Sequence, residues 1–143
     1  MGPLEGACEA WKLLLRVFAA ERARLPAIAA ELGLSEAQCL VLEHLDPAAP
    51  VLMCRLAETL DCDRSNITGI VGRLEARGLV ERRPNASDRR VKNLVLTEAG
   101  RQQRRRLLDR LAEPPAGIRA LRPEEQKTLQ AILRRAFAAD AGP

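Results

Sequence analysis

The stretch DRSNITGIVGRLEARGLVER, residues 63–82, decides the fold that we expect for this chain. Four apolar residues within it recur at i, i+3, i+4 and i+7: Ile67, Ile70, Val71 and Leu74. This spacing predicts a helix with a single buried stripe. Asp63 suits the N-cap of that helix, and Gly78 suits its end because glycine readily adopts the left-handed conformation that terminates helices.

The opposite side of the same helix is small, polar and nearly free of acidic residues: Ser65, Thr68, Gly69, Gly72 and Arg73. Such a face lets the backbone approach a nucleic acid closely. Small residues also suit helix–helix packing, but packing gives no reason for Arg64 and Arg73 to flank the patch. We therefore favour a recognition surface.

The segments before this helix predict two shorter helices. Ser35 and Gln38 form a capping box, so a helix begins there and runs to residue 45. A loop at 46–50 follows, and then a short helix at 53–60 that a tight turn connects to the helix at 64–77.

The segments after it predict a β-hairpin and a further helix. Residues 79–83 and 91–96 are short and rich in valine and leucine, and the polar stretch 84–90 separates them. Thr97 is expected to cap the following helix. The order of helix, tight turn, helix and hairpin is that of DNA-binding proteins whose second helix enters the major groove.

Longer helices are expected at both ends of the chain. Residues 8–32 show helical spacing, with a kink or an interruption of the helix expected at Pro26. Residues 114–117 should break the helix that starts at Thr97, and a last helix should open at Pro123.

Four motifs make the sequence similar to the MarR family of bacterial winged-helix regulators. They are DRSNIT at 63–68, LEARGLVER at 74–82, DRR at 88–90 and LTEAG at 96–100. The resemblance spans residues 35–112. It implies a mainly α fold with a small two-stranded β wing, and a homodimer formed through the N- and C-terminal helices. The chain would then be one domain over 1–143, with a DNA-binding lobe at 35–100 and dimerisation helices at 1–33 and 101–143.

The resemblance also implies which residues contact double-stranded DNA. Arg64, Ser65, Asn66 and Thr68 would face the major groove of a pseudo-palindromic operator. Arg89 or Arg90 would enter the minor groove, with Asp88 bracing the hairpin through an arginine. Arg82, Arg83 and Lys92 on the hairpin stems would contact the phosphate backbone, which positions a protein without specifying sequence.

The distribution of charge agrees with this interpretation. Between Cys62 and Arg110 there are 13 basic and 6 acidic residues, a net charge of +7, whereas the rest of the chain carries 10 basic and 13 acidic residues. Arginine supplies 20 of the 23 basic residues, and its planar fork suits phosphates and base edges. A basic middle segment is what a polyanion-binding surface requires.

Composition argues against other classes of protein. One histidine and no tyrosine leave few groups for acid–base catalysis, so we expect no enzyme and no catalytic residues. The four cysteines form no CxxC pair, and we expect no metal and no cofactor. No apolar run approaches the length of a membrane span, and the first residues lack the pattern of a signal peptide. We therefore expect a cytoplasmic protein without a membrane partner.

The sequence leaves the regulatory signal open. Trp11 and His44 lie on helices that could line a pocket for a small aromatic or phenolic effector, although Trp11 also suits a dimer interface and His44 a helix end. Cys62, beside Arg64, offers a thiol switch instead. The expected function is a ligand-relieved repressor. The alternatives are a redox-controlled regulator of the same fold and a winged-helix interaction module that does not bind DNA.

Overall fold

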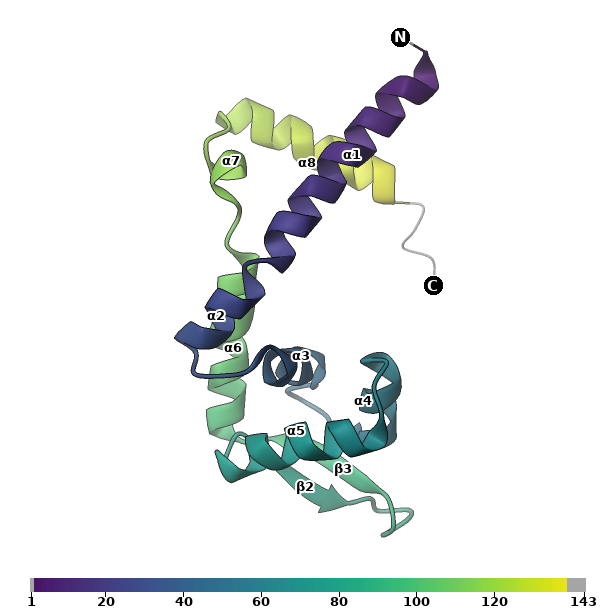
Figure 1. Cartoon of the computed structure of the whole chain (residues 1–143), viewed down its shortest axis with the longest axis vertical. Helices are drawn as coiled ribbons and strands as arrows, with labels where there is room; N and C mark the ends of the chain where they lie inside the picture. Colours follow the sequence, from purple (N-terminus) through teal and green to yellow (C-terminus); the bar gives the residue numbers. More distant parts are fainter. Residues whose placement is uncertain (1, 139–143) are drawn as a thin grey trace. The chain divides into compact units, whose positions relative to one another are not determined.

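The computed structural model describes residues 2–138, which form helices and one small sheet. The elements in chain order are α1 (Pro3–Arg22), α2 (Leu25–Glu31), α3 (Glu36–His44), β1 (Val51–Leu52), α4 (Met53–Thr59), α5 (Arg64–Ala76), β2 (Val80–Pro84), β3 (Lys92–Leu96), α6 (Glu98–Ala112), α7 (Ala116–Arg119) and α8 (Pro123–Phe137). The chain divides into two compact units between Ala112 and Glu113. The mainly helical winged helix-turn-helix fold predicted from the sequence is confirmed (Figure 1).

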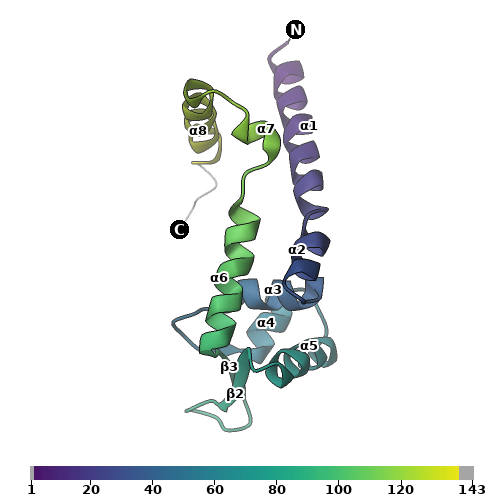
Figure 2. The same ribbon diagram turned by 90° about the vertical axis from the view of Figure 1, so that its left-hand side faces the viewer.

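The first unit contains the winged-helix lobe, by which we mean α2 to α6, residues 25–112. Its core combines the stripe of α5 with apolar side chains from α3, α4, α6 and the strands. The largest fully buried side chains include Leu42, Leu45, Leu56, Ile67, Leu74, Leu94 and Leu107. Helix α6 follows β3 in the chain and packs against α2 and α3, the first two helices of the lobe (Figure 2).

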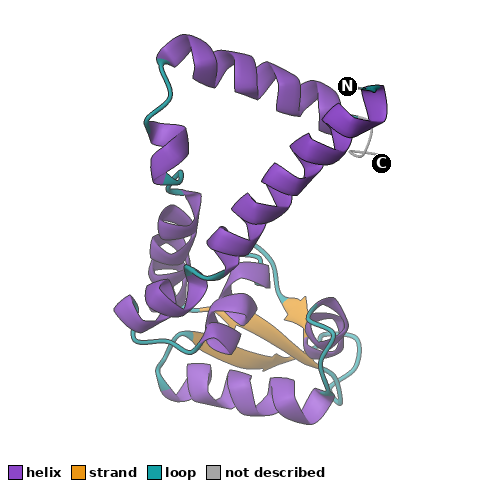
Figure 3. Ribbon diagram, turned by 45° about the horizontal axis from the view of Figure 1, so that its top comes forward, coloured by secondary structure: helices purple, strands orange, loops and turns teal. Residues whose placement is uncertain are grey.

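The sheet is antiparallel with strand order β1-β3-β2. In the hairpin, Val80 pairs with Leu96 and Arg82 pairs with Leu94. Helix α5 packs along β2, which places this helix beside the hairpin of β2 and β3 (Figure 3). Strand β1 was not predicted, because two residues are too few to show an alternating pattern.

Of the two outcomes expected near Pro26, a kink or an interruption, the structure shows the interruption, a few residues before the proline. The structure has two helices that separate at Ala23 and Arg24, and Pro26 lies in the first turn of α2 rather than at a kink. Proline has no N–H to donate, and the first turn of a helix is where that donor is not needed. The residue therefore marks the beginning of a helix.

The chain around Pro114 also differs from the expectation. Helix α6 ends at Ala112 as predicted, but the expected break at 114–117 already contains the start of the short helix α7. In this second unit α8 begins at Pro123, as predicted, with Glu124 and Glu125 in its first turn.

Within residues 2–138, no single helix combines the length and apolar composition needed to cross a membrane. In the same range, the helical segments Leu4–Glu31 and Glu36–His44 are long and apolar enough only when they are taken together. The chain bends by 97° between these two segments.

Candidate nucleic-acid interface

Helix α5 has one buried and one exposed face, as its sequence predicts. Ile67, Ile70, Val71 and Leu74 are each at most 4% exposed. The predicted DNA-facing residues at the N-terminal half of the helix are all exposed: Arg64, Ser65, Asn66 and Thr68. Arg73, further along, is exposed as well. The buried stripe therefore fixes the rotation of α5 and presents a basic surface outward.

The N-terminus of α5 leaves backbone donors on this surface. Asp63 occupies the N-cap position with extended geometry, as expected, but its side chain forms no capping hydrogen bond. The predicted position of the N-cap is therefore confirmed, but the side-chain hydrogen bond that usually accompanies an aspartate N-cap does not form. The first N–H groups of a helix have no partner within the helix and favour anions such as phosphate. The Thr68 hydroxyl bonds back to the Arg64 carbonyl at 2.7 Å.

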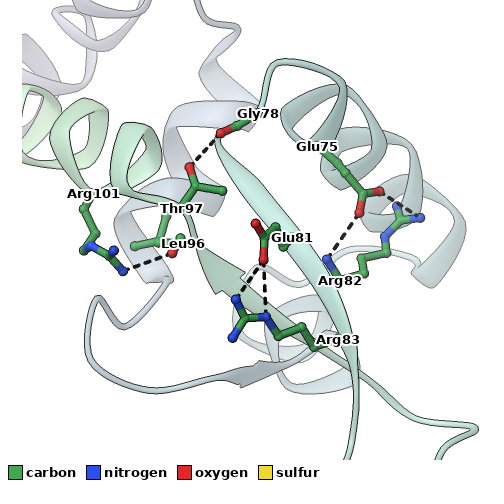
Figure 4. Close-up of polar contacts among 8 residues, drawn as sticks. All are labelled: Glu75, Gly78, Glu81, Arg82, Arg83, Leu96, Thr97 and Arg101. Carbon is green, nitrogen blue, oxygen red and sulfur yellow. Dashed lines mark hydrogen bonds and ion pairs between the residues drawn. The ribbon is translucent and has the colours of Figure 1, made fainter.

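The C-terminal end of α5 is terminated by Gly78 and bonded to the start of α6 through Thr97. Gly78 adopts φ +69°, the left-handed geometry expected of a glycine that ends a helix. Its carbonyl accepts a hydrogen bond of 2.6 Å from the Thr97 hydroxyl (Figure 4). The same hydroxyl accepts the Gly100 N–H at 3.0 Å. Thr97 thus caps α6, as predicted, and ties its first turn to the end of α5.

The tip of the wing is shaped by side chains that bond to nearby backbone. The Asn85 side-chain oxygen accepts the N–H groups of Ser87 at 2.8 Å and Asp88 at 3.3 Å. Asp88 in turn accepts the Arg90 main-chain N–H at 2.9 Å. The expected partner of Asp88 is an arginine side chain, whereas the structure bonds its carboxylate to the main chain of Arg90. Arg89 and Arg90 both lie exposed at this tip.

The three basic residues of the hairpin stems differ in their surroundings. Arg83 is 61% exposed and pairs with Glu81 at 2.8 Å, and Lys92 is exposed. Arg82 is only 29% exposed: its guanidinium contacts the Thr68 carbonyl at 3.0 Å and Glu75 at 3.6 Å. The sequence predicts the same phosphate-binding role for all three residues. In the structure, however, the guanidinium of Arg82 is bound to α5.

A cavity of about 350 Å³ lies where α4, α5 and the wing meet. Its lining combines apolar side chains with four cations: Met53, Cys54, Arg64, Ile67, Thr68, Arg82, Arg90, Val91 and Lys92. Arg82 is already engaged with Thr68 and Glu75, so the cations of this hollow that remain available to an anion such as a DNA phosphate are Arg64, Arg90 and Lys92.

Three residues are candidates for regulation: Trp11, His44 and Cys62. Cys62 lies next to α5 in the sequence, whereas Trp11 and His44 come from earlier helices. Trp11 is 51% exposed on α1. His44 ends α3, and its Nδ1 lies 2.8 Å from the Leu40 carbonyl oxygen, as expected for a histidine in a last turn. Cys62 is half-buried beside the N-terminus of α5. Cys39 is buried, and this burial, followed by the charges of Glu36 and Glu43, raises the pKa of its thiol.

Sequence reasoning missed two residues that support α5. Glu75 accepts the Arg82 main-chain N–H at 3.2 Å, and Arg77 donates through its guanidinium to the Gly33 carbonyl. The second contact joins residues 44 positions apart in the chain. Helical spacing classifies both residues as solvent-facing, and no local pattern reveals partners at that separation. Within the described residues, no group of His, Cys, Asp and Glu could hold a metal ion.

Comparison with curated proteins identifies relatives of the same kind. The MarR family profile matches residues 32–91. The chain is 27% identical over 107 residues to YybA of Bacillus subtilis, described as an uncharacterised HTH-type transcriptional regulator, and the match covers 73% of this chain and 71% of YybA. It is 35% identical over 68 residues to MdtR of the same organism, an HTH-type transcriptional repressor, covering 48% of this chain and 44% of MdtR.

Solved structures show the same architecture. A mutant of MarR from E. coli is 26% identical and superposes with a TM-score of 0.71 over 88% of this chain and 94% of that one. A mutant of MepR from S. aureus, bound to an oligodeoxyribonucleotide, is 18% identical with a TM-score of 0.65 over 90% and 96% of the two chains. The second likeness concerns the fold alone.

Proposed function

We propose that this chain, which belongs to the MarR family of winged helix-turn-helix transcription regulators, is a homodimeric repressor that a small ligand releases from its operator. The family consists of DNA-binding regulators and not of enzymes. In the proposed division of labour, residues 35–100 bind DNA while residues 1–33 and 101–143 form the dimer. The name of the relative MdtR, a repressor, supports the direction of regulation.

The observation that carries the proposal is the exposed face of α5 together with the wing. Arg64, Ser65, Asn66 and Thr68 lie on the surface at the helix's N-terminal half, where recognition helices contact base edges. Arg73 lies further along the same helix. At the wing tip, Arg89 and Arg90 have the long cationic side chains that a narrow minor groove attracts.

Phosphate contacts would come from the remaining cations of the surface. Arg83 forms an exposed ion pair with Glu81, which costs little to exchange for a phosphate. Lys92 lies at the rim of the cavity between α5 and the wing. These contacts fix register and add affinity on any sequence.

The decisive experiment is a titration of duplex DNA from the region upstream of the protein's own gene. With roughly 6–10 phosphates neutralised, the affinity of a dimer should fall by about 10³–10⁵-fold between about 50 and 200 mM salt. Arg89→Ala should weaken this binding. The matched control is Arg105→Ala, an exposed arginine of α6 outside the proposed surface, which should leave binding unchanged. A flat salt dependence would support a protein-interaction module instead.

The proposed switch is a small aromatic acid or phenol that binds the DNA-incompetent dimer better than the competent one. Trp11, the only tryptophan, is half-exposed on α1 and would report such binding by fluorescence, and His44 is the second proposed contact. A panel of substituted benzoates and phenols should change Trp11 emission and weaken DNA binding over one concentration range.

The alternative switch is oxidation of Cys62. It predicts that mild peroxide releases the DNA, that a thiol reductant restores binding, and that Cys62→Ser abolishes the response. Half-burial of Cys62 favours the ligand, because cysteines packed as small apolar residues are usually inert. Reversible release by peroxide without any response to the aromatic panel would select the redox mechanism.

A further inference from the structure

The neighbouring residues Arg82 and Arg83 of β2 have the same side chain and opposite surroundings. Successive side chains of a strand point to opposite faces. Arg82 follows the buried Val80 at a spacing of two and faces α5, whereas Arg83 faces the same side as Glu81 and pairs with it (Figure 4). The two arginines therefore cannot share one role.

Arg82 makes three contacts with α5. Its Nη2 donates to the Thr68 carbonyl at 3.0 Å, its Nη1 lies 3.6 Å from the Glu75 carboxylate, and its main-chain N–H donates to Glu75 at 3.2 Å. The Arg82 Nε is fully buried. A helical carbonyl already accepts a bond within its own helix, so the Thr68 oxygen uses its second lone pair for the guanidinium.

The guanidinium lies directly against the backbone of α5. A Cβ placed on Gly72 would be 3.6 Å from the Arg82 Nη2, which puts the charged group beside a helical position that has no side chain. Thr68, on the proposed reading face, and Glu75, two turns further along, are thus both held by one residue of the wing.

We propose that Arg82, together with Glu75, is a positioning residue that fixes the recognition helix relative to the wing, and that it is not a ligand of DNA phosphate. The two elements read different grooves, so their relative placement decides whether base contacts and wing contacts form together. This inference rests on the proposed DNA binding. It assigns Arg82 to sequence specificity and leaves Arg83 and Lys92 as the phosphate contacts of the stems.

The first test needs no DNA. Hydrogen–deuterium exchange of the full chain should show faster exchange in residues 64–76 of Arg82→Ala, by about fivefold, the size of one net hydrogen bond. Arg83→Ala is the matched control and should exchange like the wild type. Equal exchange in both variants would overturn the positioning role, whether or not the protein binds DNA.

The second test compares the upstream duplex with a random-sequence duplex of equal length. Arg82→Ala should lose about tenfold in affinity for the upstream duplex, less than about twofold for the random one, and keep the wild-type salt slope. Arg83→Ala should weaken both alike and reduce the slope by about 1 per protomer. A reduced slope with equal losses for Arg82→Ala would make it a phosphate ligand and overturn the proposal.

Glu75→Gln gives an independent answer if Arg82→Ala does not fold. A positioning role predicts a lower ratio of upstream to random affinity, because Arg82 loses its ionic partner. A phosphate-ligand role predicts that both affinities rise together with the ratio unchanged, because Arg82 is released toward the DNA. A wild-type protein that binds neither duplex would refute the proposed function, and the exchange experiment would still decide the placement of α5.

Discussion

The winged-helix lobe places its apolar side chains inside the fold, whereas the terminal helices α1 and α8 leave many of theirs at the surface. The stripe of α5 is at most 4% exposed. On α1, by contrast, Trp11, Leu13 and Phe18 are 51%, 52% and 54% exposed, and on α8 Ile132 is 49% exposed. Several large apolar side chains exposed along one helix are typical of an interaction site. The lobe is complete as one chain, and the terminal helices are the part for which we propose a second copy.

The largest expected effect comes from removing one terminal helix. Deletion of residues 123–143 should give a monomer in sedimentation, because the apolar face of α8 is lost. DNA affinity should fall by about 10²–10⁴-fold, since two half-sites are no longer held together. Ile132→Glu should reproduce the effect within an intact chain, with the exposed Gln130→Glu as its control. A truncated protein that stays dimeric would show that the proposed interface lies elsewhere.

The lobe should respond instead to a change in its packing. A Cβ on Gly100 would lie 1.8 Å from the Leu79 carbonyl oxygen, a backbone atom that cannot move aside easily. Gly100→Ala should therefore lower the free energy of unfolding by about 3 kcal/mol in urea denaturation. Gly69 is the matched control, because nothing lies within 4 Å of its added Cβ. Gly69→Ala should raise stability by roughly 1 kcal/mol through helix propensity. Similar losses in both variants would contradict the close packing of α6 against the chain at Leu79.

The same contrast explains which features the sequence could predict. The Ser35–Gln38 capping box, with bonds of 3.2 and 2.8 Å, and the stripe of α5 depend on residues within two helical turns, so spacing reveals them. The hairpin follows from short apolar runs around a polar tip. These local signals are strong in the lobe because its core selects one face of each element.

Contacts between distant residues could not be predicted in this way. The Arg77–Gly33 contact and the placement of Arg82 against Thr68 depend on how α2, α5 and β2 pack. Pro26 permits either a kink within a helix or the start of a new one, and sequence spacing does not distinguish them. For α1 the sequence indicates apolar side chains such as Trp11 that suit a dimer interface, but periodicity shows only that a stripe exists and not which surface covers it.

A smaller effect should separate base reading from backbone contact within the lobe. Arg64→Ala should cost about 1–3 kcal/mol on the upstream duplex, the size of one base contact, and much less on random DNA. Arg83→Ala should weaken both duplexes alike. Anisotropy titrations with the two duplexes measure the difference. Equal losses for both variants on both duplexes would remove residues 64–68 from the base-reading role.

The smallest expected effect is at the start of α8, where local polar contacts hold a helix whose apolar face is exposed. Glu125 accepts the Arg122 main-chain N–H at 2.8 Å and the Arg122 guanidinium at 2.9 Å. The guanidinium bond first, and the backbone bond second, lower the pKa of the Glu125 carboxyl below its ordinary value. A lowered pKa in the folded state means that the stabilisation is complete above the ordinary pKa and is lost as the pH falls through the lowered one.

The first turn of α8 should therefore loosen as the pH falls below the ordinary pKa of a glutamate carboxyl and through the lowered one, and amide NMR shifts of residues 122–126 should follow the titration of Glu125. Glu125→Gln is the matched variant, because its side-chain oxygen still accepts the Arg122 N–H but carries no titrating proton. In that variant the pH dependence of these shifts should disappear while the helix remains. If the shifts of the Gln variant move with pH as those of the wild type do, the Glu125 carboxylate does not stabilise this end of α8. The lobe is stabilised by its core, and that result would remove the evidence that local polar contacts stabilise the terminal helix instead.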